Sequence, residues 1–524
     1  MPSYSSAVKV ALELFKDLAE DMEDVPISLN DITSALTGLS NTMVAIREQA
    51  ITVDYLELSE KGYGYASSRS NSWQNMYVGF VRFKDTFIKD YSAVGQRSAD
   101  TKDMVTLEVY VSRGREYVDI LRNLVAEQFT PDYGVKVNVN MVNGSEGLIM
   151  IRYVAGTAPD LAIAIGSGIP FEFSVRGALM PLDEFNKSYT LDNGTQVLSY
   201  QDLLAQSYYE EEIIPYKYQG HYYGLPETQN WAALFYRTDI LEELDVEPPD
   251  TWEDVYNLVP VLTKDGYSFY FPYGVGNYSP FLYQRGGEFY DADGLKSALN
   301  TEAAYEAFVE YANLYLQYNF IYAADFYMRF KNGEMPLGIG DMGFYCKLRY
   351  SAPELNGKWA ILPVPGHTVM NDEGEIVVDR SNGGAGTCSI IISSTKHPEE
   401  AWQFLQWWGS DAVQAEYGRE VEATFGVASR WNPANKNAVE TLPYTQEELD
   451  VIFSQWEWLK ESPNTLGGYY TSRYLITALN QTVLQGKNAR VALEDAIKEI
   501  NKEMKRKQKE YKITDGQSVL QANY

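Results

Sequence analysis

The residue types that could support catalysis or hold a metal occur without a recognisable spacing. The three histidines, His221, His367 and His397, are far apart along the chain, and we expect them at the surface. The two cysteines, Cys346 and Cys388, form no CxxC pair, which indicates no zinc site and leaves their pairing open. No GxSxG, HExxH, Walker A or GxGxxG motif occurs. The sequence therefore predicts neither a metal nor a cofactor.

Carboxylates are abundant, with 72 Asp and Glu residues, but no two of them stand out by their spacing. A glycoside hydrolase needs two convergent carboxylates, and so many acids will always supply candidate pairs. The stretch DADG at 291–294 begins like a calcium loop but lacks the later oxygen ligands and the closing Glu, so we expect a hairpin turn there. Nothing in the sequence indicates catalysis.

Charge and aromatic content favour a different class of protein. The 43 Lys and Arg residues leave a net charge of -29, which repels nucleic acid and anionic lipid. The chain has 41 Tyr, 21 Phe and 10 Trp, so that 14% of it is aromatic. Tyr and Trp combine an apolar face with a polar edge. They suit ligands that are apolar on one side and hydroxylated on the other, as sugars are.

Length and terminal sequence bound the organisation of the chain. The 524 residues are enough for two or three domains. No apolar run approaches the roughly 18 residues of a membrane span. The first residues, MPSYSSAVKVALELF, lack the basic and apolar regions of a signal peptide. We expect either a cytoplasmic protein or a chain whose native leader has been removed.

Two hydrophobic periodicities divide the chain. Residues 1–100 show helical spacings only and predict an all-α helical module. From Val105 the period changes to two, and the predicted strands alternate with helices. These strands are expected at 105–111, 135–141 and 161–165. The resulting βαβαβ order predicts a parallel sheet whose ligands bind beyond the carboxyl ends of the strands.

Two short segments are expected together at that edge of the sheet. Arg113 follows the first strand, and Gly166-Ser167-Gly168 follows the third. Residues this small would let a ligand ring approach the backbone closely. We therefore expect a ligand to lie against this rim.

Seven further motifs follow in a fixed order. They are RGALMPLDEF (176–185), YYGLPETQNWAALFYRTDIL (222–241), PPDTWEDV (248–255), FLYQRGGEFYDADG (281–294), FKNGEMPLGIGDM (330–342), WAILPVPG (359–366) and SNGGAGTCSIIISSTKHPEEAWQFLQWW (381–408). In this order they resemble the extracellular solute-binding proteins of family 1, the carbohydrate-binding subunits of ABC importers. The resemblance spans roughly residues 104–510.

The resemblance implies an α/β fold of the two-lobed periplasmic-binding-protein type (type II), which captures its ligand by hinge closure. Residues 104–230 with 380–445 would form the first lobe, and 231–379 with 446–511 the second, after the helical module of residues 1–100. The segment LFYR (234–237) would be the first crossing between the lobes, and the GGAG segment the return.

The same resemblance implies which residues face the ligand. Where many relatives end the FxxGxxxMxxxG segment with Trp, this chain has Asp341-Met342-Gly343-Phe344-Tyr345. Either Tyr345 replaces the missing aromatic platform or the ligand differs from that of those relatives, and Asp341 would accept hydrogen bonds from sugar hydroxyls. The predicted ligand-binding residues are Arg113, Ser167, Asn230, Trp231, Tyr283, Asp341, Tyr345, Gly384, Arg430, Trp431 and Tyr470.

Four of these residues also have a structural interpretation. Trp231 would be a core residue, and Arg113 a solvated charge in a turn. Tyr283 would pack between the lobes without touching ligand. Asp341 would cap a turn. The sequence alone leaves these alternatives open.

Together these features favour a secreted, surface-tethered and monomeric receptor that delivers an oligosaccharide to an ABC transporter permease and binds no nucleic acid. Two alternatives remain open. One is a secreted glycoside hydrolase, which would need two convergent carboxylates. The other is a protein of the same fold that binds a non-sugar solute such as a peptide.

Overall fold

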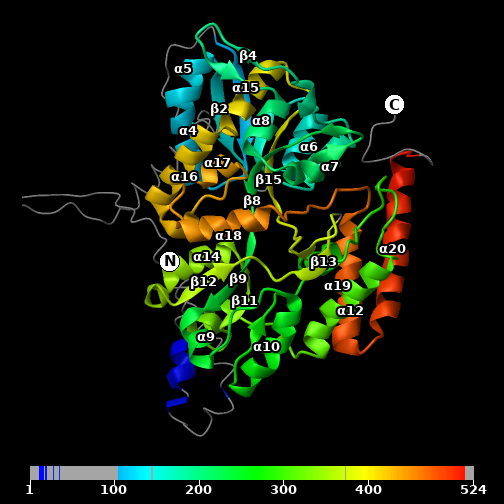
Figure 1. Ribbon diagram of the computed structural model, residues 1–524. Coiled ribbons are helices and arrows are strands. Elements are labelled where there is room, and N and C mark those ends of the chain that lie inside the picture. Colours follow the sequence, from blue (N-terminus) through cyan, green and yellow to red (C-terminus); the bar gives the residue numbers. More distant parts are fainter. Residues whose placement is uncertain are drawn as a thin grey trace, which may run out of the picture. The chain divides into compact units, whose positions relative to one another are not determined.

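The computed structural model describes residues 104–142, 146–371 and 373–513, together with 11–16, 18–19, 28 and 35 (Figure 1). The chain divides into two units, Met1–Val94 and Gly95–Tyr524. In the first unit, residues 11–16, 18–19 and 35 are helical. The other helices predicted within residues 1–100 lie outside the described residues.

The second unit begins with a five-stranded sheet of order β2-β1-β3-β15-β8. Its strands are β1 (Thr106–Val111), β2 (Lys136–Met141), β3 (Leu161–Gly166), β8 (Leu225–Gln229) and β15 (Gly386–Ile391). Strand β1 pairs in parallel with both β2 and β3, and β15 runs antiparallel between β3 and β8. The predicted βαβαβ order is confirmed. Strands β1 and β2 show the period-two alternation, whereas β3 is apolar and buried from Leu161 to Ile165, as expected of a central strand covered on both faces.

Helices cover the first sheet on both faces. On one face, Leu107 and Val109 pack with Trp402 and Trp408 of α15. On the other, Tyr110 and Ala162 pack with residues of α6 and α7. The covering helices are α4 (Arg115–Leu124), which continues through η3 (Val125–Phe129) into α5 (Thr130–Tyr133), and α6 (Glu146–Val154), α7 (Ile169–Ser174), α15 (Pro398–Trp408) and α16 (Asp411–Phe425). Each apolar side chain removed from water contributes about 1.5–3 kcal/mol, so this layered core dominates the stability of the lobe.

A second, four-stranded sheet has the order β10-β11-β9-β12. Its strands are β9 (Ala232–Arg237), β10 (Phe269–Tyr270), β11 (Leu337–Asp341) and β12 (Trp359–Leu362). Strand β9 runs antiparallel to both β11 and β12. The surrounding helices are α9 (Thr238–Leu244), α10 (Trp252–Lys264), α11 (Ser279–Tyr283), α12 (Glu302–Leu316), α13 (Phe326–Asn332), α14 (Met342–Ser351), α18 (Gln446–Trp456), α19 (Tyr469–Gln485) and α20 (Ala489–Glu510). The two sheets form the centres of two α/β lobes, as the predicted fold class requires.

The chain passes between the lobes three times. The first crossing consists of Asn230 and Trp231, because β8 ends at Gln229 and β9 begins at Ala232. The segment LFYR (234–237), which was predicted to be the first crossing, follows it in the chain and lies inside β9 of the second sheet. The return crossing, 382–385, leads into β15. The third comprises α18 and residues 457–468, and Figure 1 shows α18 lying between the two lobes.

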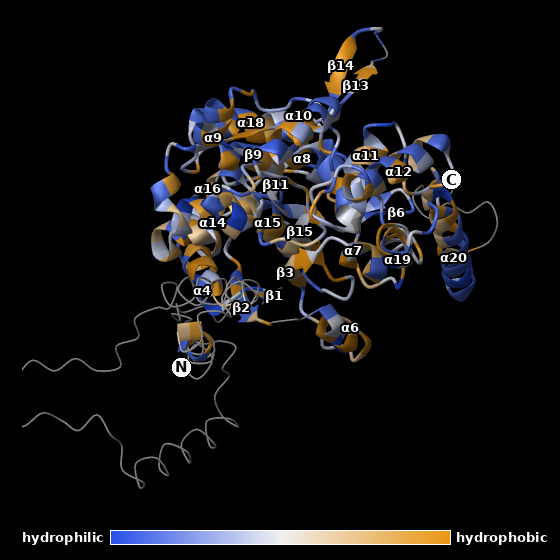
Figure 2. Ribbon diagram, turned by 90° about the horizontal axis from the view of Figure 1, so that it is seen from below, coloured by the Kyte–Doolittle hydropathy of each residue, from blue (hydrophilic) through white to orange (hydrophobic). Residues whose placement is uncertain are grey.

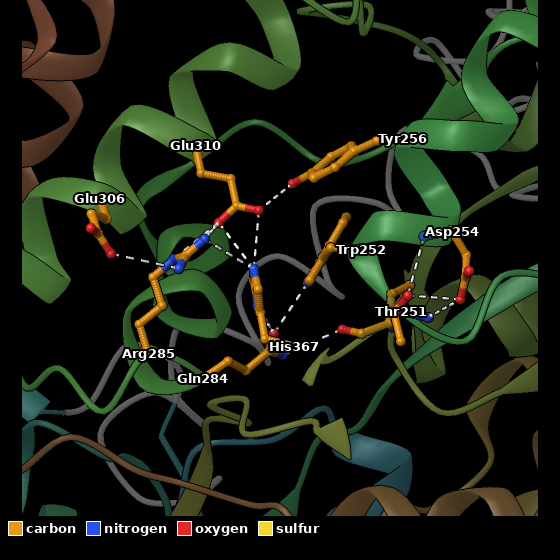
Figure 3. Close-up of polar contacts among 10 residues, drawn as sticks. Thr251, Trp252, Asp254, Tyr256, Gln284, Arg285, Glu306, Glu310 and His367 are labelled. Atoms are coloured by element: carbon orange, nitrogen blue, oxygen red, sulfur yellow. Dashed lines mark hydrogen bonds and ion pairs between the residues drawn. The ribbon is translucent and has the colours of Figure 1, made fainter. Parts of the chain in front are cut away.

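A buried polar network stabilises the second lobe (Figure 3). His367 lies within 3.0 Å of the Glu310 carboxylate and 2.8 Å of the Gln284 side chain. Arg285 and Tyr256 also bind Glu310. Burial alone would raise the pKa of Glu310, but the hydrogen bonds from His367 and Tyr256 and the charge of Arg285 outweigh it and lower that pKa. The expectation that His367 is a surface residue is therefore wrong, because its ring closes this network.

The network lies at the base of a β-hairpin that projects from the second lobe (Figure 2). Strands β13 (His367–Met370) and β14 (Ile376–Asp379) form it. Met370 and Ile376 are cross-strand partners and are both largely exposed.

No helix among the described residues is long and apolar enough to cross a membrane.

Glycine at position 386 is required where the return crossing joins the first sheet. A Cβ atom at Gly386 would lie 1.8 Å from the Thr228 carbonyl oxygen of β8. We expect Gly386→Ala to lower the free energy of unfolding by about 1–3 kcal/mol, because strands β8 and β15 must separate to admit the methyl group. Urea denaturation measures the change.

Gly147→Ala is the matched control, since no atom lies within 4 Å of a Cβ at Gly147 in helix α6. This substitution should leave stability unchanged or raise it by up to about 1 kcal/mol. Equal stability of the two variants would contradict the close packing at Gly386.

Candidate ligand-binding cleft

A cavity of about 750 Å³, here called the cleft, lies where the three crossings meet. Both lobes and all three crossings contribute to its walls. Among the predicted ligand-binding residues, the cleft is lined by Asn230, Trp231, Tyr283, Asp341 and Gly384. Its volume falls in the range of ordinary small-molecule sites.

The first-lobe wall is formed by the N-terminal end of α7 and the residue before it. Gly168, Phe171 and Glu172 line the cleft there. Ser167 is not among the lining residues, but its carbonyl accepts a hydrogen bond from Asn464 of the third crossing. A left-handed turn does not explain these small residues, because the positive φ belongs to Ala164, within β3.

The first crossing connects the two lobes through side chains as well as backbone. The Asn230 amide donates to the Asp341 carboxylate at 3.4 Å. Asp341 also caps α14, since its other oxygen accepts the Phe344 backbone N–H at 3.0 Å. Trp231 is only 3% exposed and packs against Phe235 and Tyr345. Trp231 is therefore mainly a core residue that shows a small part of its surface to the cleft.

Glu461, in the third crossing, is a cleft residue that the sequence analysis missed. One of its carboxylate oxygens accepts the backbone N–H groups of Gly384 and Ala385, at 2.9 and 2.8 Å. The same oxygen accepts the Gln229 side-chain amide at 3.2 Å. The backbone N–H of Gly384, a predicted ligand-binding residue, is thus bound by Glu461. The Pro- and Asn-containing stretch ESPN between two helices was the only signal in the sequence.

Gly384 has a steric role at the same point. A Cβ atom there would lie 1.9 Å from the Gln229 side-chain nitrogen and 2.8 Å from the Asn230 carbonyl. Only glycine lets the return crossing pass this close to the first crossing. The two crossings are therefore in contact at the wall of the cleft.

The lining is aromatic, polar and acidic. Tyr283, at 3% exposure, has the Lys460 ammonium 5.0 Å from its ring centre. Burial raises its pKa well above the usual value, so the phenol stays protonated. The aromatic lining residues are Phe171, Trp231, Tyr270, Tyr283, Phe289, Tyr290, Phe326, Phe344 and Tyr469. The amides are Asn230, Asn277, Asn382 and Asn464, and the carboxylates are Glu172, Asp341 and Glu461.

The described residues that line the cleft include no Lys, Arg or His. An anionic ligand would meet three carboxylates and no cation, which disfavours phosphates and free carboxylates. Nowhere in the described part of the chain do three or more His, Cys, Asp or Glu side chains form a group that could hold a metal ion. The arrangement suits a neutral ligand with many hydroxyl groups.

Arg113 and Trp431 lie in the first-lobe core, outside the cleft lining. The Arg113 guanidinium stacks 4.2 Å from the Trp431 ring centre and pairs with Glu227 at 3.0 Å. The Glu227 carboxylate also accepts the Ala164 backbone N–H and the Trp408 indole N–H. This buried cluster links the loop after β1 to β3, β8 and α15.

Tyr345 and Arg430 also have structural contacts. Tyr345 is 1% exposed, and its hydroxyl donates to Glu448 and accepts from Arg430. Burial raises the pKa of Tyr345 to about 12. Arg430 binds Glu422 through two nitrogens. The aromatic ring that lines the cleft from this segment is that of Phe344 instead.

Tyr470, the last of the predicted ligand-binding residues, is not among the residues that line the cleft. Tyr470 packs on Tyr469 and Tyr474, and its hydroxyl accepts from Arg506. Its neighbour Tyr469, which is 58% exposed, lines the cleft.

The sequence left the pairing of the two cysteines open. Cys346 and Cys388 are both buried and are not paired with each other.

Comparisons with known proteins agree with this geometry. A family described as bacterial extracellular solute-binding protein matches residues 115–415. The arabinooligosaccharide-binding protein of Halalkalibacterium halodurans is 23% identical over 317 residues, which are 57% of this chain and 62% of that relative. The chain's match thus spans less than two thirds of that relative.

Solved structures resemble the fold. The sugar-binding protein MalE of Xanthomonas citri matches with a TM-score of 0.62 and 17% identity, over 78% of this chain and 100% of that one. The cyclic alpha-maltosyl-1,6-maltose binding protein of Arthrobacter globiformis matches with a TM-score of 0.61 and 17% identity, over 77% of this chain and 100% of that one. These similarities establish the two-lobed fold.

The position of Arg113 leads to a stability prediction. We expect Glu227→Ala to lower the free energy of unfolding by about 3–5 kcal/mol, because Arg113 would remain buried without its partner. Urea denaturation followed by tryptophan fluorescence measures this change.

An exposed pair provides the control. Glu302 pairs with Arg490 at the surface, and Glu302→Ala should change stability by no more than about 0.5 kcal/mol. If Glu227→Ala were as mild as Glu302→Ala, Arg113 would be free to leave Glu227 and serve the ligand.

Proposed function

We propose that this chain, which belongs to the bacterial extracellular solute-binding proteins, captures a neutral oligosaccharide in the cleft and delivers it to an ABC transporter permease. The observation that carries the proposal is the lining of the cleft. It combines aromatic rings, amides and carboxylates, and the described lining residues include no cationic side chain. The oligosaccharides bound by relatives of the same fold point in the same direction.

Each part of the lining has a counterpart in a sugar. Aromatic rings such as Phe344 and Tyr469 offer flat apolar surfaces to the C–H face of a pyranose or furanose ring. Asp341 and Glu461 are charge-assisted acceptors for hydroxyl groups. Both are held in place by backbone N–H groups, so a ligand would meet them already oriented. Such preorganisation lowers the entropy cost of binding.

The same lining argues against the alternatives. A free peptide carries a terminal carboxylate, for which the described cleft residues provide no Lys, Arg or His partner. A hydrolase would need one carboxylate free to donate a proton to the glycosidic oxygen. Of the three lining carboxylates, Asp341 and Glu461 instead accept hydrogen bonds from the protein itself, and Glu172 pairs with Arg176 at 3.9 Å. Members of the family are binding proteins.

Cleft closure would connect binding to transport. A ligand that contacts both lobes stabilises the arrangement in which they enclose it. We propose that a permease recognises this arrangement, and that the protein acts as a monomer tethered at the outer face of the cell membrane. The family's extracellular character supports the location.

The first functional prediction concerns binding without turnover. Calorimetry with neutral arabino- and malto-oligosaccharides should give saturable binding to one of these series, and chromatography should return the bound sugar intact. A peptide library serves as the control and should not bind. Cleavage above the background rate would favour the hydrolase, and binding of peptides alone would favour the other solute class.

A second prediction separates the ligand contact of Asp341 from its capping role. Asn caps a helix as well as Asp does, so Asp341→Asn should leave stability unchanged. Loss of a charged acceptor for sugar hydroxyls should weaken binding about tenfold to a hundredfold. Calorimetry gives the affinity, and thermal unfolding gives the stability.

Asp325 offers a matched control. It caps α13 by accepting the Met328 backbone N–H, and it is not among the residues that line the cleft. Asp325→Asn should therefore bind sugar like the unsubstituted protein. If Asp341→Asn also bound normally, Asp341 would be a helix cap only.

A further inference from the structure

A second and larger cavity adjoins the cleft. Its volume is about 1310 Å³, and we call it the tyrosine cavity. The first lobe contributes α8 (Tyr200–Ser207), η5 (Glu210–Tyr216) and the hairpin of β6 (Lys217–Tyr218) and β7 (His221–Tyr222). The second lobe contributes Glu288 and residues 290–292. Both lobes thus form its walls, as they form those of the cleft.

The two cavities meet at two side chains. Tyr290 and Pro463 line the cleft and the tyrosine cavity alike. Tyr290 is held in place because its hydroxyl bonds Gly468 and Thr471. Burial raises the pKa of Tyr290 to about 12. Tyr290 and Pro463 therefore mark the boundary at which the two cavities are neighbours.

The lining of the tyrosine cavity shares aromatic rings and carboxylates with the lining of the cleft. It is rich in phenols and carboxylates, with one ammonium group at Lys217. Lys217 lies over the Tyr222 ring, 5.6 Å from its centre. The phenols are Tyr200, Tyr208, Tyr209, Tyr222 and Tyr290, and the acids are Asp183, Glu210, Glu211, Glu288 and Asp291. With five acids against one cation, the lining disfavours an anionic ligand here as well.

We propose that the tyrosine cavity binds the continuing residues of a neutral oligosaccharide whose first residues occupy the cleft. This inference rests on the proposed function and specifies its ligand as an extended chain. The cleft alone has the volume of an ordinary ligand site, whereas the two cavities together exceed that range. A chain that fills both contacts each lobe at two places and holds them together more strongly than a short ligand does.

The test is the dependence of affinity on ligand length. Calorimetry would compare linear neutral oligosaccharides of increasing length, from a disaccharide to an octasaccharide, on the complete chain. Short ligands occupy the cleft, and longer ones should gain a further three- to tenfold in affinity, about the value of one or two added aromatic contacts.

Ala205→Trp fills the tyrosine cavity without touching the cleft. Ala205 lies on the exposed side of α8 and lines only the tyrosine cavity. The variant should bind short ligands normally and lose the gain of long ones. Gln206→Trp is the matched control, because Gln206 is the next residue of the same helix, is exposed, and lines neither cavity. It should retain the gain.

Ala292→Trp approaches the cavity from the second lobe and should act like Ala205→Trp. Affinity that stops rising once the cleft is full would overturn this proposal and leave the proposed function intact. The same conclusion follows if both cavity-filling variants retain the gain. Absence of sugar binding at every length would overturn the proposed function, and this inference with it.

Discussion

One carboxylate oxygen of Glu461 joins the crossings between the two lobes. The side chain of Glu461, in the third crossing, accepts two backbone N–H groups of the return crossing and the amide of Gln229 at the end of β8. Three chain segments that are distant in sequence therefore converge on one atom. Hydrogen bonds to a charged acceptor are about twice as strong as neutral ones. The walls of the cleft depend on this convergence, because the segments that Glu461 joins are the ones that line it.

Close packing at the return crossing reinforces this constraint. Gly384 and Gly386 bring the backbone to within contact of the first crossing and of β8, where a methyl group would collide. The crossings therefore act as a packed unit, from which the lobes extend. Motion of the lobes is expected to pivot about this unit rather than within it, because packed interfaces deform little.

Much of the fold could be predicted from the sequence because it follows from local periodicity. Strands β1 and β2 alternate apolar residues with period two, β3 is a short apolar run, and the helices between them have apolar stripes, so the βαβαβ order was readable. The first crossing was placed a few residues late. The boundary depends on where β8 ends and β9 begins, and LFYR continues the same apolar pattern beyond it.

The candidate site was less predictable because its contacts join residues far apart in the chain. Arg113 pairs with Glu227, 114 residues away, and Tyr345 with Glu448, 103 residues away. The residue type alone does not tell whether an Arg or Tyr near a cleft loop contacts the ligand or a buried partner within the protein. Helix geometry explains the exchange of Tyr470 for Tyr469, since neighbouring helical residues point about 100° apart.

The acidic lining of the cleft has a consequence for the medium in which the protein works. Dissolved salt weakens attraction between opposite charges over distances of about 10 Å at 0.1 M ionic strength. A receptor that attracted its ligand through Lys or Arg would lose affinity as the surroundings became more saline. Contacts between rings, hydroxyls and oriented acceptors involve no net charge on the ligand. Capture by such contacts is largely insensitive to ionic strength, so the affinity would stay nearly constant while the external salinity varies.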